Sequence, residues 1–292
     1  MKRYILLPLL VSSYFLMAKP LKIDEILTQQ NNFRLDTTLA YSNIQTATNL
    51  SAIQTFQTKN GDVVNLPVYL GENKTNTDYL NYDFTLRYGV SKDIEVFAST
   101  NAYNSNTKND IFGKFKSQSN KGFNALSLGF TYQIKAENDT PALLIGASSK
   151  IYEKTKINDK NHSNKFKNFR IFATSFYTVD PVVFLLNTSY SFNRKKDLGA
   201  FKRVDADILT ISPQVYFAVN PYSSINWGIK YTHFGKTKAN NKTIGNSGSN
   251  LSFLIGLSYE LSSKLFVSLN AEFLNSHQVS QNTFSMTLSY KF

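Results

Sequence analysis

Apolar and polar residues alternate at every second position in twelve stretches of the chain. Such alternation is the signature of a β-strand whose two faces meet different surroundings. In the sixth stretch either face could be the apolar one; we choose Phe169, Ile171, Ala173 and Tyr177, which places Arg170 on the other face. The stretches are residues 33–41, 80–88, 94–98, 126–134, 143–151, 169–177, 182–192, 209–219, 225–231, 251–261, 265–273 and 284–292.

The connections between these stretches alternate between short and long. A twelve-stranded antiparallel barrel with both chain ends on the short-turn side needs this alternation. We therefore predict an all-β fold, a transmembrane antiparallel β-barrel with short periplasmic turns and long extracellular loops. The short connections are 90–93, 135–141, 180–181, 220–223 and 262–264, and the long ones lie at about 46–76, 104–122, 153–166, 193–205, 235–249 and 275–282.

A soluble β-sandwich is the alternative, since it also has short alternating strands. It does not account for the systematic connection lengths or for the single face rich in aromatic residues. The 17 tyrosines and 23 phenylalanines among 292 residues suit the aromatic girdles of a membrane barrel. The mean hydropathy of −0.27 excludes a helical membrane protein, and the absence of cysteine excludes a disulfide framework.

The N-terminal residues divide into two segments ahead of the barrel, which we assign to residues 33–292. Lys2 and Arg3 precede the apolar run "YILLPLLVSSYFLMA", which predicts a signal peptide over residues 1–18. Residues 19–32 form a periplasmic segment, either a short helix that plugs the barrel mouth or a disordered tail. The candidate plug residues, loosely at helical spacing, are Leu21, Ile23, Ile26 and Leu27.

The sequence closes on the alternating stretch "TFSMTLSYKF". A free aromatic strand would invite edge pairing, so we expect it to be the last strand of a closed barrel and the signal for the barrel-assembly machinery. Its outward residues are Phe284, Met286, Leu288, Tyr290 and Phe292. These features predict a protein of the outer membrane of a Gram-negative bacterium, with both termini in the periplasm.

Once the lipid-facing positions are fixed, the other face of each strand must point into the barrel. That face carries many charges, which a wet lumen or a paired ion network can hold and a hydrocarbon core cannot. The charges either pair and stabilise the barrel or line a conduit and set its selectivity, and the two roles are compatible. The predicted lumen-lining residues are Arg34, Asp36, Asp83, Arg87, Glu95, Lys150, Arg170, Lys230, Glu260 and Glu272.

The formal net charge of +12 comes mostly from lysines and arginines in the long connections. A secreted chain rarely meets nucleic acid, so we predict outer-membrane lipid and lipopolysaccharide as the partners of these loops. A second copy of the chain stays open as a further partner.

The search for catalytic chemistry gives no candidate. A nucleophilic serine needs a histidine within reach and an orienting group, but His162 lies in a basic loop. Outer-membrane phospholipases carry the serine two residues after the histidine, whereas Gly235 follows His233 at that distance. Metal-ligand clusters and glycine-rich phosphate loops are missing from the sequence. We predict a protein that is not an enzyme and that needs no cofactor or metal.

Two stretches carry a family likeness: "YDFTLRYGVSKDIEVFAST" (82–100) and "NALSLGFTYQIKAENDTPALLIGASSK" (124–150). They resemble the outer-membrane transporters named for the meta-pathway of phenol degradation. Residues 21–45 are similar to the branch that includes the functional-amyloid secretion pore. The resemblance implies a twelve-stranded pore with a periplasmic plug, and it implies no catalytic residues.

The function we predict is an outer-membrane channel for passive passage of a small solute through a narrow charged lumen, plugged by the N-terminal segment. One alternative is an export pore for an unfolded, amyloid-like polypeptide. Another is a closed structural or adhesive barrel whose basic loops bind surface polysaccharide. Twelve strands lie between the filled barrels of about eight and the open channels of sixteen or more.

Overall fold

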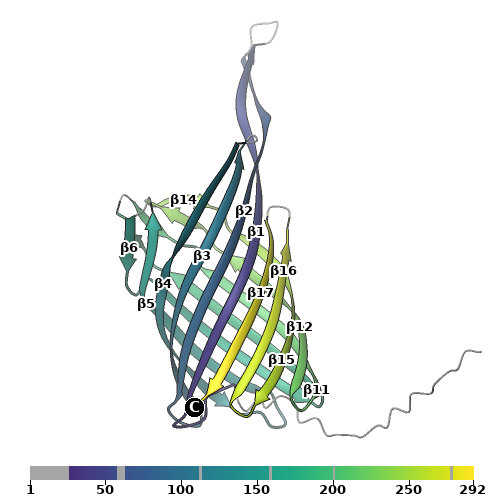
Figure 1. Ribbon diagram of the computed structural model, residues 1–292. Helices are drawn as coiled ribbons and strands as arrows, with labels where there is room; N and C mark the ends of the chain where they lie inside the picture. Colours follow the sequence, from purple (N-terminus) through teal and green to yellow (C-terminus); the bar gives the residue numbers. More distant parts are fainter. Residues whose placement is uncertain (1–25, 58–62, 112–113, 158–159, 200, 277–278) are drawn as a thin grey trace, which may run out of the picture.

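A computed structural model describes residues 26–292, apart from 58–62, 112–113, 158–159, 200 and 277–278. The predicted signal peptide, Leu21 and Ile23 lie outside the described residues. Twelve strands form a closed antiparallel barrel (Figure 1), as the alternation predicted. They are β1 (Phe33–Gln57), β2 (Val63–Gly89), β3 (Ile94–Ile111), β4 (Lys114–Lys135), β5 (Ala142–Ile157), β7 (Asn168–Val179), β8 (Val182–Asn193), β11 (Ile208–Asn220), β12 (Ser223–Phe234), β15 (Gly248–Ser262), β16 (Leu265–Asn275) and β17 (Val279–Lys291).

The barrel closes where the first strand meets the last. β1 pairs with β17 from Arg34↔Lys291 up to Thr46↔Val279, and each other strand pairs with its neighbours around the ring. Closure leaves no free sheet edge over this height, so the backbone hydrogen bonds of the wall strands are made between neighbouring strands. The last stretch of the sequence is therefore a wall strand on the seam, as its alternation predicted.

The outer and inner faces of the wall differ as the pattern predicted. Exposed large apolar residues alternate along each strand, for example Phe84 and Leu86 on β2 and Phe253 and Ile255 on β15. On β7 the apolar residues Ile171 and Val179 are exposed, whereas Phe176, which has the opposite parity, is buried. Exposed apolar residues in a continuous band are stable only against another apolar phase, here the hydrocarbon of a membrane.

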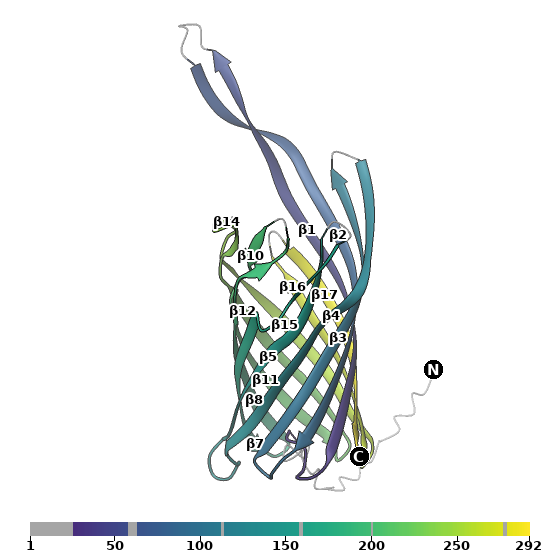
Figure 2. The ribbon, with the colours of Figure 1, turned by 90° about the vertical axis from the view of Figure 1, so that its left-hand side faces the viewer.

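The two ends of the barrel differ in their connections. At the turn end, the links are the short segments 90–93, 136–141, 180–181, 221–222 and 263–264. At the hairpin end, the predicted long loops are largely β-structure, because β1 and β2 continue far beyond the wall as a two-stranded ribbon (Figures 1 and 2). β3 and β4 form a second, shorter extension beside it (Figure 2). The sequence pattern predicted the lengths of these connections but not their regular pairing.

The other connections at the hairpin end also contain short strands. β6 (Lys160–Asn164) folds back on the end of β5. β9 (Lys196–Asp197), β10 (Lys202–Val204), β13 (Thr237–Ala239) and β14 (Lys242–Gly245) form a separate four-stranded sheet in the order β14-β13-β10-β9. The segments before β11 and after β12 are thereby held together beyond the barrel rim.

Residues 26–32 of the N-terminal segment form a bend, a single bridge and a turn, and contain no helix. The predicted plug helix is therefore wrong for this described part of the segment, which ends in Asn31 with a left-handed backbone conformation, φ of 63°. Within the described residues, no helix has the length and apolar character to cross a bilayer.

Candidate conduit through the barrel

The N-terminal segment enters the barrel at the turn end. Leu27 is 7% exposed and packs in a buried apolar cluster. Its partners come from the inner faces of β5, β7, β8 and β11, on the far side of the barrel from β1. A side chain that contacts these strands must stand inside the mouth. The cluster consists of Leu27, Ala142, Leu144, Phe176 and Val183, with Ile26, Leu185 and Tyr216 packed against it.

The next residue anchors the segment to the opposite wall. The backbone amide of Thr28 donates to Glu95 Oε2 at 2.8 Å, and the Thr28 hydroxyl donates to the same oxygen at 2.6 Å. Glu95 is completely buried. Its other oxygen accepts from Arg87 Nη1 at 2.8 Å, so the buried carboxylate is both paired and hydrogen-bonded, as a buried charge must be.

Gly89 explains how the segment comes so close to the wall. The Asn31 amide donates to the Gly89 carbonyl at 2.8 Å, and the Gly89 amide donates to the Asn32 carbonyl at 3.1 Å. A Cβ at position 89 would lie 2.2 Å from the Gln29 carbonyl oxygen and 2.4 Å from that of Thr28. Only glycine leaves room for this close backbone approach.

The charges around Glu95 form one network on β1, β2 and β3. Arg87 Nε donates to Asp36 Oδ2 at 2.6 Å, and Arg34 Nε lies 3.3 Å from Asp36 Oδ1. Two cations therefore face two anions, and the network as a whole is neutral. It gives this side of the turn end a rigid polar wall opposite the apolar cluster around Leu27.

A belt of aromatic and arginine side chains crosses the inner face on the hairpin-end side of the apolar cluster around Leu27. The Phe97 and Phe172 ring centroids are 6.4 Å apart. The Arg87 guanidinium lies 5.8 Å from the Phe97 centroid, and the Arg170 guanidinium lies 5.8 Å from that of Phe172. Both contacts are within the range of cation–π attraction. We call these four residues the aromatic belt.

Two glycines leave room for the rings of the aromatic belt. A Cβ at Gly129 would lie 2.4 Å from Phe97 Cζ, and a Cβ at Gly146 would lie 2.2 Å from Phe172 Cζ. Phe97 therefore lies flat over β4, and Phe172 lies flat over β5. The belt consequently covers the inner wall from β2 to β7 without projecting far from it.

The other charged residues expected in the lumen occupy different parts of the inner face. Lys230 on β12 forms an ion pair with Glu272 on β16, across β15. Asp83 accepts a hydrogen bond from Asn81. Lys150 lies near the hairpin end of β5, and Glu260 lies at the turn end of β15. The structure thus gathers Arg34, Asp36, Arg87 and Glu95 into one group, joins Lys230 and Glu272 in a separate pair, and places the others elsewhere on the inner face.

A second group of charges lies at the hairpin end. Lys196 of β9 is 7% exposed, and its ammonium donates to Glu153 Oε2 at 2.9 Å and lies 2.7 Å from Asp205 Oδ2. Glu153, at the end of β5, is 3% exposed. Arg203 Nε lies 2.6 Å from Asp205 Oδ1. We call Glu153, Lys196, Arg203 and Asp205 the outer charge cluster.

The outer charge cluster joins the connection between β8 and β11 to the β5–β6 hairpin. Asn164 Nδ2 donates to the Asp197 carbonyl at 3.1 Å, and the Asp197 amide returns a bond to Asn164 Oδ1 at 3.0 Å. Burial alone would raise the pKa of Asp205, but the hydrogen bond and charge of Lys196, with the charge of Arg203, hold that pKa below its ordinary value.

The described histidines do not form a catalytic group. His233 Nδ1 lies 2.9 Å from Ser249 Oγ, but both side chains are exposed on the outer face, and the Tyr231 hydroxyl shares the same serine oxygen. His162 lies against Gly199 in the outer connections, and His277 is outside the described residues. The described part of the chain also holds no group of three acidic, histidine or cysteine side chains placed to bind a metal ion.

Sequence reasoning missed several residues of these groups. Thr28 gave no signal, because its role depends on where the N-terminal segment goes. Glu153 and Lys196 fell in predicted loops, where parity gives no direction. Phe97 and Phe172 have the inward parity that was assigned to polar residues, and Gly129 and Gly146 on the same inner face were the signal that could have located the two rings.

The wall, its apolar outer band and its charged interior define an outer-membrane β-barrel. The chain belongs to the family described as "Outer membrane protein beta-barrel domain", which residues 125–292 match. No curated protein sequence matches the chain.

Three solved structures share the fold at low identity. An outer membrane channel from Pseudomonas putida F1 is 10% identical with a TM-score of 0.60, covering 88% of this chain and 95% of that one. The transport unit of the autotransporter AIDA-I from Escherichia coli is 12% identical with a TM-score of 0.56, covering 90% and 91%. The translocator domain of the autotransporter NalP from Neisseria meningitidis is 8% identical with a TM-score of 0.50, covering 89% and 88%.

Proposed function

We propose that the protein is a passive outer-membrane channel for a small solute, with residues 26–32 as its plug. The observation that carries this proposal is the insertion of Leu27 and Thr28 into the mouth of the barrel. Leu27 packs against the far wall while Thr28 bonds to buried Glu95 on the near wall. A segment that lies across the mouth in this way would obstruct a conduit through the barrel. Such a plug is expected only in a barrel that contains a conduit.

The plug is held by contacts that can be exchanged. Burying a leucine side chain contributes about 1.5–3 kcal/mol, and a hydrogen bond to a charged group contributes about 1.5–3 kcal/mol. Such a sum lies within reach of a solute or partner that competes for the same surfaces. If residues 26–32 left the mouth, the apolar cluster would be exposed first and the aromatic belt next.

We place the turn end and both termini in the periplasm, so the solute meets the plug first. The aromatic belt then offers apolar faces between two guanidinium groups, of which Arg87 already faces Asp36 and Glu95. The stretches 82–100 and 124–150 support membership of the transporter type named for the meta-pathway of phenol degradation. The similarity to a channel from Pseudomonas putida F1 supports the barrel fold of that type.

Single-channel recording in planar bilayers tests the proposal. The full-length mature protein should give small, infrequent conductance steps, and a version lacking residues 19–32 should give larger and longer ones. The full-length variant Leu27→Ser should behave like the shortened protein, because a polar side chain loses the apolar cluster. Silence of all three proteins, each inserted and folded, would favour a closed structural barrel instead.

A second candidate function is the export of an unfolded polypeptide. The observation that favours it is that residues 29–32 lie in the mouth as an irregular chain whose backbone bonds to Gly89. The lumen wall therefore accepts a non-helical polypeptide. An unfolded peptide added on the turn side should then block the current of the shortened protein at micromolar concentration, whereas a small-solute channel would be indifferent to it.

A further inference from the structure

The wall formed by β1, β2, β3 and β4 continues above the apolar band on its outer face. On β1 and β2 the apolar band reaches up to Tyr41 and Leu80, which face each other across the two strands. The next outward pair is Asn43 and Asp78, and the pair above it is Gln45 and Asn76. β7, β8, β12 and β16 have 11 or 12 residues each, whereas β1 to β4 have between 18 and 27.

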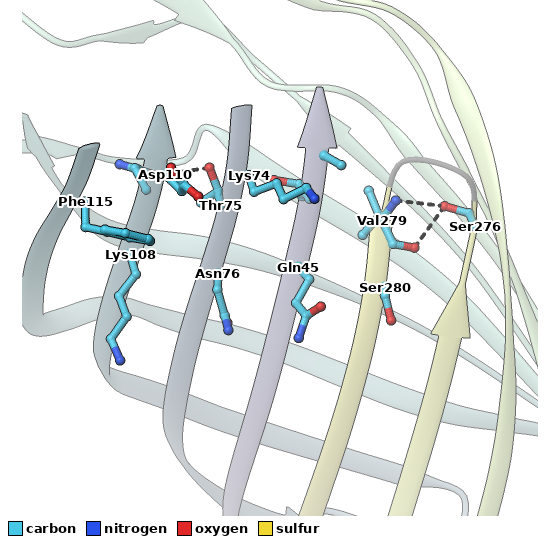
Figure 3. A pocket seen from close by; sticks show the side chains of 13 residues that line it. Gln45, Lys74, Thr75, Asn76, Lys108, Asp110, Phe115, Ser276, Val279 and Ser280 are labelled. Carbon is cyan, nitrogen blue, oxygen red and sulfur yellow. Dashed lines mark hydrogen bonds between the residues drawn. The ribbon is translucent and has the colours of Figure 1, made fainter. Parts of the chain in front are cut away.

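A hollow of about 540 Å³ lies on this part of the wall, beside the fork where β1 parts from β17. Figure 3 shows Gln45, Asn76, Lys108 and Ser280 pointing to the same side from four neighbouring strands. Their register makes them one row, since Ser280 faces Gln45, Gln45 faces Asn76 and Asn76 faces Lys108. The row above contains Lys74, Asp110 and Phe115.

The two outward rows directly below the hollow are joined to each other and to Asn76, one of its lining residues, by hydrogen bonds. The Tyr41 hydroxyl donates to Asp78 Oδ1 at 2.6 Å. Asn43 Nδ2 donates to Asn76 Oδ1 at 2.8 Å and to Asp78 Oδ1 at 2.9 Å. The carboxylate of Asp78 is therefore engaged with its neighbours, and the row above it presents amides and the exposed ammonium of Lys108.

The chemistry of the hollow fits a phosphorylated sugar. Lys74 and Lys108 line the hollow, and both are exposed. Amide side chains bond to hydroxyl groups in both directions, and Phe115, 80% exposed, offers a flat apolar face. Among the charged residues that line the hollow, the two lysines Lys74 and Lys108 against Asp110 leave an excess of one positive charge.

The height of the hollow above the apolar band indicates which kind of molecule can occupy it. Four residues separate Tyr41 from Gln45, which is roughly 10 Å along the membrane normal for a strand tilted by about 40°. A lipid-facing surface at that height meets the head groups rather than the acyl chains. With the hairpin end outward, as proposed above, those head groups are the phosphorylated sugars of lipopolysaccharide.

We propose that this hollow is a binding site for the phosphorylated sugar head group of lipopolysaccharide, with Lys74 and Lys108 contacting phosphate. The inference rests on the orientation given in the proposed function. It goes beyond general contact with surrounding lipid, because it assigns one site on one side of the barrel to the head group.

The test is the melting temperature of the full-length protein in detergent, titrated with three probes. Lipopolysaccharide should raise it by several degrees, lipopolysaccharide stripped of phosphate should act only at much higher concentration, and inorganic phosphate should have no effect. The double variant Lys74→Gln with Lys108→Gln should need at least about tenfold more lipopolysaccharide, since charge-assisted bonds to phosphate are lost. The matched control, Lys92→Gln with Lys264→Gln at exposed positions of the turn end, should titrate like the unchanged protein.

Equal titration of the double variant and the unchanged protein would overturn the proposal. So would an equal response to inorganic phosphate, which would indicate a small-anion site. Heat-modifiable migration on a gel checks that each variant is a folded barrel. Conductance is recorded from the same preparations, so normal conductance with failed binding would count against the hollow alone, and absent conductance would count against the channel.

Discussion

Gly89 is the residue on which the position of the proposed plug, residues 26–32, depends most directly. Valine at this position would place its Cβ against the carbonyl oxygens of Thr28 and Gln29, and backbone atoms cannot move aside as a flexible side chain can. We expect Gly89→Val to expel the segment and to raise the conductance about twofold or more, because the open cross-section widens. The measurement is single-channel recording.

Gly122→Val is the matched control for this change. It is also a glycine of a barrel strand, but the nearest atom to its added Cβ is Tyr103 Cε1 at 4.0 Å. Its conductance should therefore equal that of the unchanged protein. If Gly89→Val also left the conductance unaltered, the segment would not obstruct the path.

Glu95 is the second residue whose substitution should have a specific effect on the plug. Glu95→Gln keeps the shape of the side chain but removes the charge that faces Arg87 and bonds to Thr28. Breaking a buried pair costs about 3–5 kcal/mol, so the folded barrel should melt at a lower temperature and the plug should open more often. Unchanged open probability with lowered melting temperature would show that Glu95 stabilises the wall but does not hold the plug.

Among the elements, the connection between β8 and β11 depends on its buried lysine. Lys196→Met leaves Glu153 buried without its cation, which costs about 3–5 kcal/mol. We expect the connection to detach, which trypsin would report as new cleavage at Lys195 and Lys202. Lys242→Met removes an exposed lysine of β14 and should leave the cleavage pattern unchanged. Resistance of Lys196→Met to trypsin would contradict the anchoring role.

The same connection should respond to acid in a defined direction. The pKa of Asp205 in the folded protein lies below its ordinary value, so its contribution is complete at pH above the ordinary value of about 4 and is lost as pH falls through the lowered value. The connection between β8 and β11 should therefore still resist trypsin after a brief incubation at pH 5. It should lose this resistance only after incubation below about pH 4. Hydrogen exchange of residues 194–204 across that range measures it directly.

At the scale of the whole molecule, the charges of the interior should set ion selectivity. Arg170 contacts Phe172 by its guanidinium face, whereas Arg87 is held by two carboxylates. Replacing Arg170 by glutamate changes the belt by two charges and should shift the reversal potential in a salt gradient toward cations. Lys160→Glu, on an exposed position of β6, is the control. An unmoved reversal potential would remove Arg170 from the conduction path.

The barrel itself could be predicted from the sequence because one physical contrast, lipid outside and polar groups inside, repeats along every strand. On β15, for example, Phe253 and Ile255 are exposed as the alternation predicted. Contacts that depend on chain paths outside the wall could not be predicted in the same way. The bonds from Thr28 to Glu95 and from Lys196 to Glu153 join residues 67 and 43 positions apart, and no alternation encodes such distances.

The ribbon of β1 and β2 has a practical consequence for intact cells. From Thr46 to Gln57 the ribbon extends about 35 Å past the seam, so its outer part does not contact the rest of the wall. A short peptide epitope inserted between Gln57 and Val63 should leave the barrel intact, and an antibody applied to living bacteria would then bind it. Staining only after the envelope is permeabilised would mean that the ribbon points into the cell envelope and that the proposed orientation of the barrel must be reversed.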